Sequence, residues 1–163
     1  GQYLSFPSSQ GFAFPGDFTI EGWFYSTSFA NNATYSPTMI DCRGATANNG
    51  LCVLFSNSGQ VVVYKEASGT NIYTSTSTLT VNNWYHVALV RSGSTLKCYI
   101  NGVADATSIT DTTSWAAPSG TGRVGNNKDA NAGYAGYMDE FRVTKYARYL
   151  TNFTPPQVAF ANQ

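Results

Sequence analysis

Two adjacent carboxylates, Asp139 and Glu140, lie within the stretch GYMDEFRV at residues 136–143. Glycosidases use a pair of carboxyl groups that flank one bond, one as the proton donor and the other as base or nucleophile. The stretch reads as a β-strand, in which successive side chains point to opposite faces. We therefore expect Asp139 on the face of Phe141 and Glu140 on the face of Met138, where the two groups cannot act on one bond.

Structural roles suit these two carboxylates better than catalysis. We expect Glu140 to form an ion pair with Arg142 or Arg91 on a sheet face. We expect Asp139 to accept a backbone or metal contact at a strand edge.

The single histidine, His86, has no sequence context that indicates catalysis. A catalytic triad needs a histidine beside a nucleophile and a carboxylate, and the chain contains no nucleophile motif of the type G-x-S-x-G. We expect His86 to be a hydrogen-bonded packing residue of a strand. The sequence therefore predicts that the protein is not an enzyme.

Hydrophobic alternation predicts an all-β chain. Residues 17–25 (DFTIEGWFY) and 84–92 (WYHVALVRS) give the strongest strand patterns, and Asn101-Gly102 is typical of a two-residue hairpin turn. Short strands with frequent turns predict an antiparallel two-sheet sandwich of the jelly-roll type. We expect one domain over residues 1–163, as a module of a longer protein.

Composition argues against two classes of partner. The formal net charge is zero and only 11% of residues are charged, so the basic surface of a nucleic-acid-binding protein is missing. No apolar run approaches the roughly 20 residues that a membrane-spanning helix needs. We therefore expect no nucleic-acid partner and no membrane insertion.

Several ordered segments resemble one known family. Residues 17–25, then NNWYHVALVRSGSTLKCYINGV (82–103), then GYMDEFRVTKYARYLTNFTPP (136–156) are similar to the laminin-G-like, concanavalin A-like jelly rolls. The best likeness is to the divergent branch found in phage virion and bacterial surface proteins, and the opening GQYLSFPSS is also similar. The resemblance implies two curved antiparallel sheets, and a glycan- or protein-binding module of a tail, fibre or adhesin protein.

Two functions from different classes follow from this resemblance. The first is a recognition module that binds glycan on a cell surface, located on a virion or at the cell surface. The second is a structural decoration or assembly domain that binds other virion or surface subunits, including copies of itself. The tail 152–163 suits the second function, because its prolines extend it and Val158 and Phe160 could dock on a partner; alternatively it packs along its own sandwich.

Sugar recognition needs flat aromatic surface together with planar amides and carboxylates. Three loops offer these groups, and their candidate ligand-binding residues are Tyr35, Trp115, Asn126, Asn127, Asp129, Asn131 and Tyr134. The alternative is that the Asn residues satisfy turn geometry and that Trp115 closes one end of the sandwich.

The resemblance also implies one structural calcium ion between the first and last strands. Asp17 and Asp139 are the positions that it indicates as metal ligands, with carbonyl groups completing the shell. Cys42 and Cys52 flank a turn-rich segment, where they could face each other across a hairpin or remain separate thiols.

Overall fold

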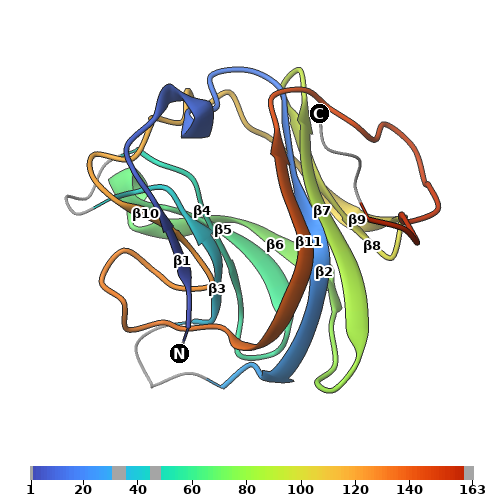
Figure 1. Cartoon of the computed structure of the whole chain (residues 1–163). Coiled ribbons are helices and arrows are strands. Elements are labelled where there is room, and N and C mark those ends of the chain that lie inside the picture. The colour runs from blue at the N-terminus through green and yellow to red at the C-terminus, as the bar shows by residue number, and fades with distance from the viewer. Residues whose placement is uncertain (1, 31–35, 45–48, 160–163) are drawn as a thin grey trace.

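The computed structural model describes residues 2–30, 36–44 and 49–159, which form two antiparallel sheets packed face to face (Figure 1). The six-stranded sheet contains, in order, β1 (Leu4–Phe6), β10 (Gly122–Val124), β3 (Thr38–Asp41), β4 (Cys52–Phe55), β5 (Gln60–Lys65) and β6 (Thr70–Thr78). The five-stranded sheet contains, in order, β11 (Ala135–Thr144), β2 (Phe18–Ser28), β7 (Trp84–Ser92), β8 (Thr95–Ile100) and β9 (Val103–Thr110). Two short 3-10 helices, η1 (Gln10–Phe12) and η2 (Glu66–Ser68), accompany them. The predicted two-sheet antiparallel sandwich is confirmed.

The core lies between the two sheets. On β2 the alternate residues Phe18, Ile20 and Phe24 point inward, as the period of two in the sequence predicts. The six-stranded sheet contributes inward-pointing residues of its central strands to the same core, such as Val53 and Val63. No helix among the described residues is long and apolar enough to cross a membrane.

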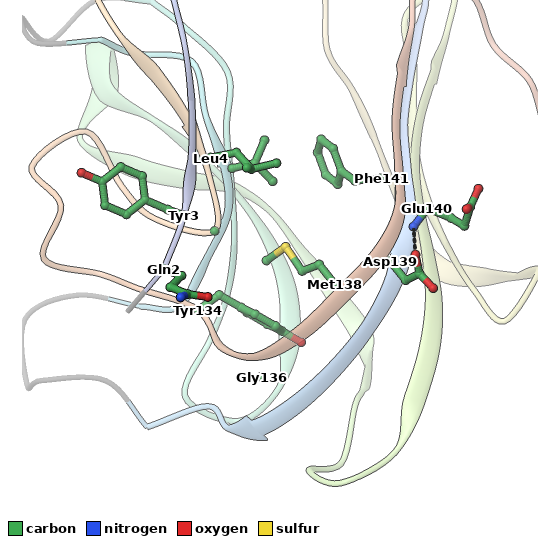
Figure 2. Close-up of a pocket in the computed structure, with 11 residues that line it drawn as sticks. Gln2, Tyr3, Leu4, Tyr134, Gly136, Met138, Asp139, Glu140 and Phe141 are labelled. Carbon is green, nitrogen blue, oxygen red and sulfur yellow. Dashed lines mark hydrogen bonds between the residues drawn. The ribbon is translucent and has the colours of Figure 1, made fainter. Parts of the chain in front are cut away.

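A β-bulge in β11 carries the two adjacent carboxylates. Asp139 is paired with Trp23, and the next two residues, Glu140 and Phe141, lie opposite the single residue Gly22. Glu140 takes up the left-handed conformation with φ of 50°. Phe141 points into the space between the sheets, whereas Asp139 and Glu140 both point away from it (Figure 2). The prediction that strand alternation separates the two carboxylates is therefore wrong, because a bulge adds one residue to the strand.

The arginines expected to pair with Glu140 bind other carboxylates. Arg142 Nε donates to Glu21 Oε1 at 2.9 Å. Arg91 Nη1 lies 3.1 Å from Asp111 Oδ2. These contacts fix each arginine to a neighbouring strand or loop.

The segment after β11 crosses the outer side of the five-stranded sheet, away from the other sheet (Figure 1). The rings of Tyr149 and Phe153 stack at 3.5 Å between centroids. Phe153 packs over Tyr99, and its amide donates to Gly102 O at 2.9 Å. As far as Pro156, whose carbonyl oxygen accepts the Trp23 Nε1–H at 3.3 Å, the tail lies against its own sandwich, whereas residues 157–159 are exposed.

The three cysteines are free thiols, all buried. Cys42 belongs to the core between the sheets. Cys52 is paired with Tyr64 of β5 and points to the opposite, outer face of the sheet. The thiols of Cys42 and Cys52 therefore cannot meet in a disulfide.

Candidate functional site

A polar groove of about 380 Å³ lies on the outer face of the six-stranded sheet. Its floor is formed by outward residues of β4 and β5, Leu54, Val62 and Tyr64, which alternate with the core residues of the same strands. Glu66 of η2 and the loop 126–132 form its sides. A volume of this size suits a small ligand or one or two units of a chain.

A buried ion-pair network holds the groove in shape. The Asp41 carboxylate, fully buried, accepts hydrogen bonds from Arg43 Nε at 2.9 Å and from Arg43 Nη2 at 2.6 Å. The same carboxylate accepts the backbone N–H of Lys128 at 2.8 Å, which ties the loop 126–132 to β3. Arg43 Nη1 also donates to Glu66 Oε2, and the guanidinium lies 5.2 Å from the centroid of the Tyr64 ring. One carboxylate therefore preorganises both sides of the groove.

The electrostatics of the floor follow from this network. Burial alone would lower the pKa of Arg43, but the hydrogen bonds to Asp41 and Glu66 and the nearby charges outweigh burial and raise that pKa. Burial raises the pKa of the Cys52 thiol well above its ordinary value, and the charge of Asp41 adds to the effect. At neutral pH the groove is thus lined by the charged Arg43 guanidinium, and the neutral Cys52 thiol is fully buried outside its lining.

The structure brings two of the predicted ligand-binding residues to this groove. Asn127 and Asp129 both line it, together with Lys128. Lys128 Nζ lies 3.0 Å from an oxygen of the exposed Asp129 carboxylate, so the rim carries a second ion pair. The loop therefore presents charged groups above the Tyr64 floor, whereas the Asn127 amide, in a residue only 4% exposed, is hydrogen-bonded to Asn131.

Two other predicted residues of this loop maintain its turn. Asn126 is buried, and its Oδ1 accepts the N–H groups of Asn127 and Ala132 at 2.9 and 3.0 Å. Asn131 receives a 2.7 Å hydrogen bond on its Oδ1 from Asn127 Nδ2. For Asn126 and Asn131 the structure agrees with the alternative that asparagines satisfy turn geometry.

Trp115 and Tyr134 cannot serve as stacking platforms. Trp115 is only 1% exposed, and its Nε1–H donates to Asp111 Oδ2 at 2.9 Å. Tyr134 is 8% exposed, and its hydroxyl lies 2.6 Å from Ser26 Oγ. Both rings instead belong to the core, so these two ligand assignments are wrong. The seventh candidate, Tyr35, lies outside the described residues.

The two predicted metal ligands lie far apart. Asp17 precedes β2 and accepts the Gly93 N–H at 2.7 Å, whereas Asp139 is paired with Trp23 near the middle of the same strand. Six residues of extended chain separate those positions, which is about 20 Å. Within the described ranges no group of three or more His, Cys, Asp or Glu residues could hold a metal ion. A single ion shared by Asp17 and Asp139 is therefore ruled out.

Another pocket, of about 830 Å³, opens between the two sheets where the edge strands β1 and β11 face each other (Figure 2). Leu4, Met138 and Phe141 point into it, and the carboxylates of β11 point away (Figure 2). Gln2 and Tyr3 also line it, so this pocket combines an apolar wall with polar groups at its edge.

Three groove residues were not predicted from the sequence: Arg43 after β3, Tyr64 of β5 and Glu66 of η2. The predicted ligand contacts lie in Asn-rich loops, whereas the floor of the groove comes from β4 and β5. One signal was present: only 11% of the chain is charged, so Asp41 and Arg43 at the end of a buried strand are conspicuous.

The sequence matches the family model described as the concanavalin A-like lectin/glucanases superfamily over residues 1–152. A search of curated proteins finds no significant match.

Solved structures share the fold. A candidate carbohydrate binding protein from Bacteroides ovatus is 23% identical with a TM-score of 0.66, over 91% of this chain and 44% of that one. Domains LG4-5 of the mouse laminin α1 chain are 14% identical with a TM-score of 0.64, over 93% of this chain and 43% of theirs. The CBM40 module of a Ruminococcus gnavus IT-sialidase, solved with α2,3 sialyllactose, is 12% identical with a TM-score of 0.65, over 92% of each chain. The chain thus spans less than half the length of the first two proteins.

Proposed function

Since the chain belongs to the concanavalin A-like lectin/glucanases superfamily, we propose that it is a non-catalytic module that binds glycan in the groove over β3, β4 and β5. The observation that carries the proposal is the Tyr64 ring set beside a fixed guanidinium and a rim of amides and carboxylates. The sugar-bound Ruminococcus gnavus module, which has this fold, supports glycan as the class of ligand.

The groups of the groove match the two sides of a sugar ring. A tyrosine ring offers an apolar surface to the C–H face of a pyranose, and carboxylates, amides and ammonium groups bond its hydroxyls. Tyr64 supplies the first kind of contact, and Asn71, Lys128 and Asp129 supply the second. Because the ion pairs hold these groups in place, little entropy is lost on binding.

The charges of the groove favour a neutral sugar. Arg43 is paired with Asp41 and Glu66, and Lys128 is paired with Asp129. The cationic groups are therefore already compensated by carboxylates, and an acidic sugar would compete with those carboxylates for them.

The same pairing speaks against glycoside hydrolysis. A glycosidase needs one carboxylic acid and one carboxylate on opposite sides of the bond that breaks. In the groove, Glu66 binds Arg43 and Asp129 binds Lys128. Each carboxylate is thus held by a cation rather than arranged as an acid and a base around one bond.

A glycan array on the purified domain, with and without calcium, tests the proposal. We expect binding to one or more neutral glycans, and a loss of about tenfold or more in affinity for Tyr64→Ala. Tyr146→Ala, at an exposed tyrosine on the other sheet's side of the molecule, is the matched control and keeps the affinity. If no glycan binds in either condition, the proposal fails.

We place this module at a virion or cell surface, as part of a fibre, tail or surface protein. Its overlap with only part of the Bacteroides ovatus and laminin chains is consistent with a module that works inside a larger protein.

An assembly domain that binds other subunits is the second candidate function. Leu4 of the edge strand β1 is 71% exposed and Tyr3 beside it is 43% exposed. Exposed apolar residues on an edge strand favour pairing with another chain. Light scattering after size-exclusion chromatography tests whether the domain self-associates. A concentration-dependent dimer would support assembly, and a monomer at every concentration would contradict self-assembly.

A further inference from the structure

Three aromatic side chains form a row across the outer face of the five-stranded sheet. Tyr137 of β11 is paired with Tyr25 of β2, and Tyr25 is paired with Trp84 of β7, so each of three adjacent strands contributes one ring. The centroids of neighbouring rings lie 5.9 and 5.6 Å apart. We call these three residues the aromatic row. The proposed glycan groove lies on the other sheet and does not use it.

The aromatic row is open to solvent at both ends. Trp84 is 45% exposed and Tyr137 is 65% exposed, whereas Tyr25 between them is half-buried. Large aromatic side chains gathered at one exposed place indicate an interaction surface, since they leave apolar area in water. Within the described ranges no group accepts a hydrogen bond from the Trp84 indole N–H, which is therefore available to a ligand.

The shape of the aromatic row suits a peptide better than the face of a sugar. The ring planes of Tyr137 and Tyr25 are inclined by 52°, and those of Tyr25 and Trp84 by 54°. Neighbouring rings at such angles form ridges with furrows between them, whereas a pyranose stacks on a flat surface. Grooves that bind proline-rich segments are lined with aromatic side chains, between which proline rings fit.

The protein already holds one proline-containing segment against this face. Trp23 of β2 lies two residues before Tyr25, and its Nε1–H donates to the Pro156 carbonyl oxygen at 3.3 Å. Adjacent prolines keep that part of the tail extended. Pro156 and Trp84 line one pocket of about 420 Å³, which connects this contact to the aromatic row. The fold itself therefore pairs an indole N–H with a proline carbonyl group beside the row.

The spacing of the aromatic row matches the repeat of a proline-rich chain. Tyr137 and Trp84 are on strands separated by two strand spacings, which is about 9.5 Å. A polyproline II helix advances about 9.3 Å in each turn of three residues, so residues i and i+3 face the same way. Prolines at those two positions can contact Tyr137 and Trp84 together, and the Trp84 N–H can donate to a carbonyl group of the same chain.

We propose that the aromatic row binds a proline-rich segment of another protein, in the polyproline II conformation, running across β11, β2 and β7. Such a segment is stiff before it binds, so it loses little conformational entropy. The proposal goes beyond glycan binding and is independent of it, because it uses the other sheet.

The test titrates two uncharged peptides, PPTPPT and AATAAT, both acetylated and amidated, into the ¹⁵N-labelled domain. The Trp84 indole N–H signal should shift with the proline peptide, while that of the buried Trp115 stays in place. The alanine peptide should bind about tenfold more weakly or worse, because it lacks the proline rings and loses more conformational entropy. A separate titration with maltohexaose, a neutral oligosaccharide, should leave the Trp84 signal unchanged.

Two variants remove one exposed ring each. Trp84→Ala and Tyr137→Ala should each weaken binding of the proline peptide about tenfold, followed on the backbone amides of β2 and β7. Tyr146→Ala, at an exposed tyrosine beyond the opposite end of β11, is the matched control and keeps the affinity.

Three results would overturn the proposal. They are an unshifted Trp84 signal with the proline peptide, equal affinity for the two peptides, and full affinity in both Trp84→Ala and Tyr137→Ala. A Trp84 signal that shifts with maltohexaose and not with the proline peptide would also overturn it and would assign the aromatic row to glycan.

Discussion

The hydroxyl of Tyr149 donates a 2.8 Å hydrogen bond to Oε2 of Glu21, a residue 128 positions earlier in the chain. Glu21 is fully buried on the outer face of β2, and Arg142 and His86 also approach its carboxylate, at 2.8 and 3.3 Å. This one carboxylate therefore fastens the C-terminal segment to the outer face of the five-stranded sheet.

Glu21→Gln should destabilise the fold strongly. The amide cannot match the charge of Arg142, and breaking an ion pair with a buried carboxylate costs roughly 3 kcal/mol. Tyr149→Phe, which keeps the stacked ring and removes only the hydroxyl, should cost about 1–2 kcal/mol. Urea denaturation measures both. A Glu21→Gln variant as stable as the wild type would contradict the fastening role.

Stability should fall in acid, and Glu21 should account for part of the fall. Burial alone would raise the pKa of Glu21, but the adjacent His86 ring and the hydrogen bonds from Tyr149 and Arg142 outweigh burial and lower that pKa below its ordinary value of 4.5. A depressed pKa stabilises the folded state above the unfolded-state pKa, and this contribution is lost as the pH falls from about 4.5 through the folded-state pKa.

The difference between wild type and Glu21→Gln isolates this effect from other carboxylates. The gap in unfolding free energy between the two proteins should be constant near neutral pH and shrink below about pH 4.5. Denaturation curves at several pH values provide the test. A difference in unfolding free energy that widens in acid would contradict a lowered pKa for Glu21.

Trp115 should matter for stability and not for ligand binding. Trp115→Phe removes the hydrogen bond to Asp111 and part of a buried ring, so we expect a loss of about 2 kcal/mol. Glycan affinity of the folded variant should equal that of the wild type. A variant with normal stability and reduced affinity would restore Trp115 as a ligand contact.

Gly102→Ala should loosen the C-terminal segment. Gly102 has φ of 77°, and an added Cβ would lie 1.9 Å from the Phe153 carbonyl oxygen. The segment must move away, so the amide of Phe153, which donates to Gly102 O, should exchange with solvent much faster. Gly69→Ala, also at positive φ but with open space around it, is the control for backbone strain alone. Equal exchange of the Phe153 amide in both variants would argue against the steric mechanism.

Much of the fold could be predicted because short stretches of sequence, by hydrophobic alternation and turn residues, indicate the strands and hairpins. The alternation in residues 17–25 and 84–92 corresponds to β2 and β7, and Asn101-Gly102 forms the turn between β8 and β9. The bulge at Glu140 could not be predicted, because alternation gives no sign of an extra residue. Gly22 opposite it, a glycine within a strand, was the available hint.

The candidate site was predicted less well, because loop position does not determine which way a side chain faces. Trp115 and Asn126 both lie in loops, and both are buried. Asn127 and Asp129 do reach a groove, but its floor comes from residues that only the tertiary fold brings together, such as Tyr64 and Arg43. Burial decided the role of each loop residue, and burial is a property of the whole fold.

The most direct test of glycan binding over the six-stranded sheet is chemical-shift mapping of the ¹⁵N-labelled domain with a neutral glycan identified on the array. We predict that the perturbed amides cluster at Tyr64, Glu66, Asn71 and residues 127–129, and that Tyr64→Ala abolishes the cluster. Perturbations centred instead on β2, β7 and β11, or in the gap between β1 and β11, would contradict the assignment.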